Sequence, residues 1–210
     1  MKDLERFITG FRSFQKDYFG SEIPQFEPLK QGQSPKTMII GCSDSRVDPA
    51  ILTNCAPGDI FTVRNVANLV PPYEENGGLH GVSAALEFAV CHLGVEHIIV
   101  LGHSQCGGIN ALMAGSCGCK GGGFISRWMS IATPAREKVL AELPGKDAKL
   151  QQRAAEQAAI LLSLENLRTF PWIEQRVKDG ALSLHGWYFD LNAGELSEYQ
   201  PAFGLFHKIN

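Results

Sequence analysis

The chain has 210 residues, of which 44% are hydrophobic, and it carries a formal net charge of −3 at pH 7. This length and this hydrophobic content suffice for one sizeable core and argue against a disordered chain. The slight acidity provides no basic surface, so we expect neither nucleic acid nor a membrane as a partner.

The N-terminal sequence MKDLERFITGF places charges between its apolar residues, which does not fit a secretory signal. No stretch approaches the roughly 18 to 20 apolar residues of a membrane span. We therefore expect a cytoplasmic protein, whose cysteines remain reduced. The cysteines are Cys42, Cys55, Cys91, Cys106, Cys117 and Cys119.

Residues 1–35 are predicted to form an N-terminal helical arm. Apolar side chains recur there at helical spacing up to Tyr18, and Pro24 and Pro28 then favour an extended path. Such an amphipathic arm can pack on a partner subunit or on the core of its own chain, and the sequence favours neither alternative.

Three short apolar segments are predicted to be buried strands, at residues 36–41, 59–64 and 97–101. The segment 81–93 lies between the second and third strands and has the spacing of a helix. Strands that alternate with helices indicate an α/β fold with a mainly parallel central sheet, flanked by helices.

The second half of the chain completes this single domain, which we place at residues 36–210. Residues 124–179 are predicted to be mostly helical, with breaks at prolines. Two late strands, at 181–190 and 194–199, are joined by an Asn-Ala-Gly turn and are expected to form a hairpin at the edge of the sheet.

The glycine-rich stretch at residues 115–123 lacks the Gly-Lys-Ser/Thr ending of a phosphate-binding loop, and we interpret it as a surface loop. Its Cys117 and Cys119 are separated by one residue, a poor spacing for chelating zinc.

Two pairs of potential metal ligands follow predicted strands. Cys42 and Asp44 come after the first strand, and His103 and Cys106 come after the third. The carboxyl ends of parallel strands converge at one edge of a sheet, so these side chains are expected to meet. Two thiolates and one imidazole suit zinc and leave a fourth position for water or for Asp44.

Each of these residues also has an ordinary structural explanation. A buried cysteine packs like a small apolar residue, Asp44 could cap a helix, and His103 could occupy a turn. Spacing alone leaves both alternatives open.

The motifs that surround these ligands resemble those of the β-class carbonic anhydrases. They are CSDSR at residues 42–46 and GHSQCGG at residues 102–108, and the likeness continues through residues 33–36, 57–59, 64–73 and 184–187. The resemblance implies a lyase that reversibly hydrates carbon dioxide to bicarbonate and a proton. It also implies that zinc is held by Cys42, His103 and Cys106.

The resemblance further implies that Asp44 and Arg46 form a catalytic dyad, which orients a zinc-bound hydroxide for attack on carbon dioxide. A bidentate guanidinium keeps a carboxylate ionised and fixed, which suits that role. Asp44 remains an alternative fourth ligand of the metal.

By the same likeness, the substrate pocket is lined by Gln33, Phe61, Val66, Phe88 and the Gly107 amide. Phe88 replaces a tyrosine of plant members and lacks its hydroxyl. Ile39 replaces a tryptophan that helps some bacterial members bind an inhibitory bicarbonate, and it argues against that pocket here.

The resemblance also implies a homodimer or a larger homo-oligomer, with the arm on the partner and the active sites near the interface. Three alternatives remain: a hydrolase of carbon disulfide or carbonyl sulfide, a zinc protein closed by Asp44, and a redox protein that uses Cys117 and Cys119. No histidine outside the ligand set is singled out as a proton shuttle.

Overall fold

A computed structural model describes residues 2–19, 26–75, 78–115 and 123–209 of the chain. These residues form a six-stranded sheet in the order β2-β1-β3-β4-β5-β6, in which the first four strands are parallel and the last two antiparallel. The mainly parallel α/β fold is therefore confirmed. The strands are β1 (Thr37–Cys42), β2 (Ile60–Asn65), β3 (His97–His103), β4 (Ser183–Asp190), β5 (Glu195–Gln200) and β6 (Leu205–Lys208).

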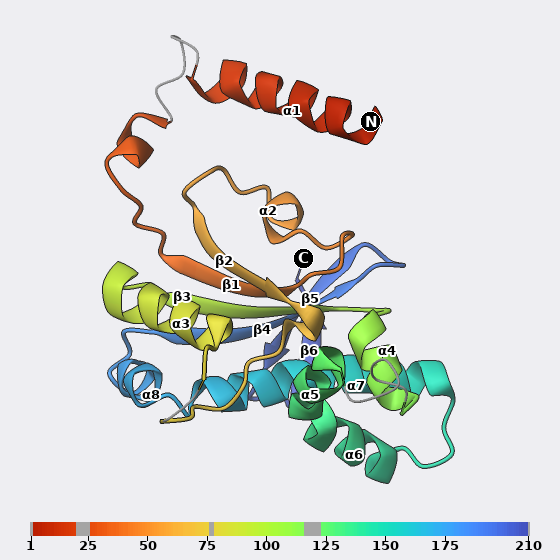
Figure 1. The fold of residues 1–210 in the computed structure, drawn as a ribbon. Coiled ribbons are helices and arrows are strands. Elements are labelled where there is room, and N and C mark those ends of the chain that lie inside the picture. The colour runs from red at the N-terminus through yellow and green to blue at the C-terminus, as the bar shows by residue number, and fades with distance from the viewer. Residues whose placement is uncertain (1, 20–25, 76–77, 116–122, 210) are drawn as a thin grey trace.

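The two faces of the sheet are covered unequally. Most of the helices lie on one side of the sheet (Figure 1). Met38 and Ile40 of β1 pack into the main core, whereas Ile39 belongs to a cluster on the opposite face. That opposite face carries a smaller apolar cluster around Ile99 and Leu101. Burial on both faces explains why the central strands are continuously apolar in sequence rather than alternating.

Helices follow the strands, and most of them lie on the side of the sheet that carries the main core (Figure 1). They are α2 (Pro49–Leu52), η3 (Val66–Asn68), α3 (Gly81–Glu87), the π-helical η4 (Phe88–Leu93), α4 (Gly107–Met113), α5 (Phe124–Met129), η5 (Ser130–Ala132), α6 (Thr133–Glu142), α7 (Ala148–Leu167) and α8 (Pro171–Lys178). Pro134 and Pro171 lie in the first turns of α6 and α8, so they begin these helices.

The long helix α7 approaches the sheet closely because two glycines leave room for it. A Cβ atom on Gly102 would lie 2.6 Å from Cδ1 of Ile160, and one on Gly186 would lie 2.9 Å from Cγ2 of the same residue. These missing side chains let α7 lie against β3 and β4, directly behind the loop that follows β3.

The predicted arm is helical. Helix α1 (Lys2–Phe19) stands apart from the sheet in Figure 1, and its Phe14 and Tyr18 contact Phe26. Phe7 and Phe11 remain 60% and 61% exposed. The boundary of the arm at residue 35 stays a prediction.

The late hairpin is confirmed as β4 and β5, and β6 extends the sheet beyond it. Cys117 and Cys119 lie outside the described residues. Among the described helices, none has the length and apolar character that crossing a membrane would require.

Candidate metal centre

The loop after β1 positions Cys42, Asp44 and Arg46. Cys42 ends the strand, and the Asp44 carboxylate accepts hydrogen bonds from Nε and Nη2 of Arg46 at 2.9 and 2.7 Å. It also accepts the backbone N–H of Arg46 at 3.0 Å, which closes a tight turn. The Arg46 guanidinium strongly lowers the pKa of Asp44, so this carboxylate stays ionised.

Arg64 holds the same loop from the neighbouring strand β2. Its guanidinium donates to the carbonyls of Cys42 and Asp44 at 2.9 and 2.7 Å, and to the Asp48 carboxylate at 2.7 Å. Asp48 also caps α2. Sequence reasoning placed Arg64 within the family likeness but gave it no role, since only the fold brings it beside these carbonyls.

The loop after β3 presents His103 and Cys106. Nδ1 of His103 lies 2.8 Å from the carbonyl oxygen of Ser104, so Nδ1 carries the proton and Nε2 keeps its lone pair. Cys106 precedes the first turn of α4. Nη2 of Arg46 donates to the carbonyl of Gln105 at 3.3 Å and thereby joins the two loops.

The two loops bring Cys42, His103 and Cys106 together, as the sequence predicts. Their three potential ligand atoms all lie within 4.8 Å of one another, and the side chains are buried. Nε2 of His103 is buried without a hydrogen-bond partner, which is costly unless the atom serves as a ligand. This donor set and the orphaned nitrogen fit a zinc ion.

The close packing of the three potential ligands shifts the pKa of each of them. A hydrogen bond from Cys106 lowers the pKa of the Cys42 thiol, and the same contact, together with burial, raises the pKa of Cys106. Burial disfavours protonation of His103, but the neighbouring Cys42 outweighs it and raises the pKa of His103. The pair of thiols therefore readily supplies a thiolate to a metal.

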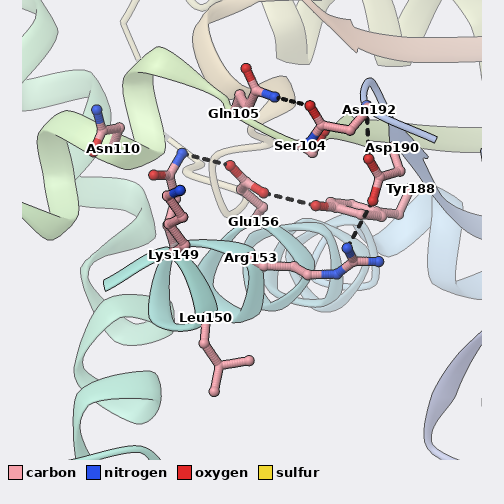
Figure 2. Close-up of a pocket in the computed structure, with 11 residues that line it drawn as sticks. Ser104, Gln105, Asn110, Lys149, Leu150, Arg153, Glu156, Tyr188, Asp190 and Asn192 are labelled. Atoms are coloured by element: carbon pink, nitrogen blue, oxygen red, sulfur yellow. Dashed lines mark hydrogen bonds and ion pairs between the residues drawn. The ribbon is translucent and has the colours of Figure 1, made fainter. Parts of the chain in front are cut away.

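A buried carboxylate supports Cys106 from behind. Glu156 of α7 is 3% exposed, and its Oε1 accepts the Cys106 backbone N–H at 3.0 Å and Nε2 of Gln152 at 2.9 Å. Its Oε2 accepts the hydroxyl of Tyr188 at 2.9 Å. Glu156 lines a cavity of about 690 Å³, whose wall also includes Gln105 and Asn192. Figure 2 shows these residues as sticks.

Sequence reasoning missed Glu156. The available signal was an acidic residue on the otherwise apolar face of α7, next to Ala155 and one turn before Ala159 and Ile160. Such a residue must have buried partners, but the sequence did not show which they were.

Glu156→Ala is expected to lower the free energy of unfolding by about 1–3 kcal/mol, because it leaves the N–H of Cys106 and the hydroxyl of Tyr188 unsatisfied. Glu156→Gln, which keeps one acceptor oxygen for Cys106, should cost less. Urea unfolding of both variants measures the difference in stability. The amount of zinc that stays bound after dialysis shows whether Cys106 is still held in position to bind the metal. Equal stability of Glu156→Ala and the parent chain would contradict this role.

The predicted pocket residues divide into two groups. Val66 directly follows Asn65, which pairs with Cys42, and its side chain lies against the backbone at Gly108. Gly107 directly follows Cys106, and a Cβ atom placed on it would meet no neighbouring residue within 4 Å. Both lie beside the metal ligands.

Phe61, Phe88 and Gln33 lie elsewhere in this chain. Phe61 pairs with Met38, four residues before Cys42, which places it roughly 13 Å along the strand from the ligands. Its ring stacks on Phe88, with centroids 5.8 Å apart. Gln33 is exposed and precedes the amino end of β1. A shared pocket for all five residues stays a prediction.

The fold and the centre together define an α/β metalloprotein with a Cys-His-Cys ligand set at the carboxyl ends of parallel strands. The family model described as carbonic anhydrase matches residues 37–196. The chain is 43% identical over 180 residues to the chloroplastic beta carbonic anhydrase 5 of Arabidopsis thaliana, a match that covers 86% of this chain and 59% of the relative. It is 38% identical over 207 residues to a carbonic anhydrase of Synechocystis, covering 97% and 73%.

Solved structures agree with this assignment. The β-carbonic anhydrase CcaA superposes with a TM-score of 0.93 at 35% identity, covering 100% of this chain and 93% of that one. A tetrameric β-carbonic anhydrase of Sordaria macrospora gives a TM-score of 0.82 at 28% identity, covering 99% and 100%. The chain belongs to the β-class carbonic anhydrases, a family of zinc enzymes that hydrate carbon dioxide.

Proposed function

We propose that this chain reversibly hydrates carbon dioxide to bicarbonate and a proton, with zinc held by Cys42, His103 and Cys106. The observation that carries the proposal is the junction of the two loops, where the Asp44–Arg46 pair reaches Gln105 beside the buried ligands. A purely structural zinc site has no need for an ionised carboxylate held at its edge.

The residues around the centre have different roles in this reaction. Zinc, when bound, acts as a Lewis acid that lowers the pKa of a coordinated water. Asp44 accepts a hydrogen bond from the nucleophile and fixes the direction of its attacking lone pair, and Arg46 holds Asp44 in position. Val66, whose side chain lies beside Gly108, offers an apolar wall to the uncharged substrate. The N–H of Gly107, the exposed first residue of α4, offers a donor.

The test is stopped-flow hydration of carbon dioxide by the purified protein at mildly alkaline pH, together with measurement of bound zinc. We expect fast hydration and about one zinc per chain, since the described residues hold one Cys-His-Cys cluster. Stoichiometric zinc without hydration at any pH would indicate that Asp44 closes the coordination sphere. Absence of zinc would refute the proposal.

We further propose that a second copy of the chain completes the substrate pocket with its own Gln33, Phe61 and Phe88. Phe88 is 44% exposed and stacks on Phe61 away from the ligands of its own chain. The apolar face of α1, with Phe7 and Phe11, supplies a surface for the partner.

The double variant Phe7→Asp/Phe11→Asp is expected to dissociate this assembly and to reduce hydration with it. Two charges on the apolar face of α1 would have to be buried against the partner, which is strongly unfavourable. Sedimentation velocity measures the assembly, with Lys16→Ala on the same helix as the control. A monomeric parent chain with full activity would contradict the proposal.

We place the protein in the cytoplasm. The described cysteines Cys42, Cys55, Cys91 and Cys106 are free thiols. Free thiols are typical of a reducing compartment, which supports this location. Fractionation of the source cells tests it.

A further inference from the structure

Two further histidines, His97 and His185, lie on the face of the sheet that carries Ile99 and Leu101, opposite α7. Nδ1 of His97 and Nε2 of His185 are 3.3 Å apart, and their rings are tilted by 54°. His97 is the first residue of β3, whereas His103 is the last. Six residues of strand therefore separate this pair from the catalytic ligands by roughly 20 Å.

The spacing of the two nitrogens is that of ligands on one metal ion. Two bonds of about 2.05 Å at a tetrahedral angle place their nitrogens about 3.3 Å apart. The strand register fixes the two residues: His185 pairs with Ile99, and Ser183 pairs with His97. Both side chains consequently emerge on the same face from adjacent hydrogen-bonded strands.

A carboxylate orients the inner histidine. Oε1 of Glu198 lies 3.0 Å from Nδ1 of His185 and accepts the indole N–H of Trp187 at 3.3 Å. The carboxylate keeps the proton of His185 on Nδ1 and leaves the Nε2 lone pair directed at His97. A carboxylate behind a ligating imidazole is the usual support of a metal-bound histidine.

Access and proton balance also suit a metal ion. His97 is exposed, and the side chains of His185 and Glu198 are 29% and 35% exposed. The proton that now joins the two rings would move from Nδ1 to Nε2 of His97, so each ring stays neutral and offers one lone pair. Water fills the remaining coordination positions.

We propose that His97 and His185 form a peripheral binding site for a divalent transition-metal ion, supported by Glu198. Imidazole ligands suit Zn²⁺, Cu²⁺ and Ni²⁺ rather than Mg²⁺ or Ca²⁺. The site is distinct from the catalytic centre and does not depend on the proposed activity.

The test is calorimetric titration of Zn²⁺ into the zinc-loaded protein, combined with the ring ¹⁵N resonances of His97 and His185 in the parent chain. We expect one further equivalent of Zn²⁺, with both rings shifting as it binds. Equimolar Mg²⁺ should produce neither effect. Because the NMR arm uses the unmodified chain, it does not depend on how a variant folds.

Variants locate the ion. His97→Ala, at an exposed position, should abolish the further equivalent, and Glu198→Gln should weaken it about 10- to 100-fold. His80→Ala, which removes a partly exposed histidine just before α3, is the control and should bind normally. Absence of a further equivalent, or its persistence in His97→Ala, would overturn the proposal and leave the pair as a structural hydrogen bond.

Discussion

Cys106→Ala is expected to lose zinc and carbon dioxide hydration together. The change removes one of three ligands, and the remaining Cys42 and His103 cannot hold the ion in a catalytic geometry. Lewis-acid activation supplies several kcal/mol of transition-state stabilisation, so the rate should fall about a thousandfold or more.

Loss of the metal must be separated from loss of the fold, because Cys106 is 2% exposed and belongs to a core cluster. Circular dichroism and urea unfolding of Cys106→Ala address this point. The matched control is Cys91→Ala, which removes an exposed thiol and should keep zinc and activity. A Cys106→Ala protein that retained one zinc per chain would show that the ion binds elsewhere.

Asp44→Asn is expected to keep zinc but to reduce kcat/KM by roughly a hundredfold or more, the scale of a lost positioned acid–base group. The amide has nearly the shape of the carboxylate, yet it lacks the negative charge that Arg46 holds in place and that accepts the hydrogen bond of the nucleophile. Retained zinc is the essential readout, because it excludes Asp44 as an indispensable ligand.

The pH dependence gives a second test of the same pair. The pKa of Asp44 is lowered by Arg46, so its carboxylate would be protonated only well below its ordinary value of about 3.9. Asp44 should therefore contribute no loss of activity between neutral pH and about pH 5. Arg46→Lys keeps the positive charge without the bidentate geometry, and an undiminished kcat/KM in that variant would argue against orientation as the role of Arg46.

The sequence predicted the local elements of the centre well. Apolar strands ending in CSDSR and GHSQCGG located both ligand loops, because a parallel sheet brings the carboxyl ends of neighbouring strands together. Cys42, His103 and Cys106 converge as expected. The family likeness added the pairing of Asp44 with Arg46, which the spacing of residues alone does not specify.

The contacts behind the centre were not predictable in the same way. Glu156 reaches Cys106 across 50 positions, and Arg64 reaches Cys42 across 22, because helix packing and strand pairing determine these contacts. The left-handed backbone of Ala67, with φ at 65°, is likewise held by its surroundings, since alanine has no intrinsic preference for it. Strand β6 is short and exposed at the edge, so its apolar pattern is weak.

Segments late in the chain hold the loop that carries His103 and Cys106, which affects the order of folding and metal binding. The N–H of Ser104 bonds to the carbonyl of Phe189, the N–H of Leu191 bonds to Oγ of Ser104, and Cys106 depends on Glu156. A nascent chain that has left the ribosome only as far as α4 already carries all three ligands but lacks the segments that fix them. Stable metal binding is therefore expected only after these later segments have folded onto the loop, and the ligand thiols stay uncoordinated until then.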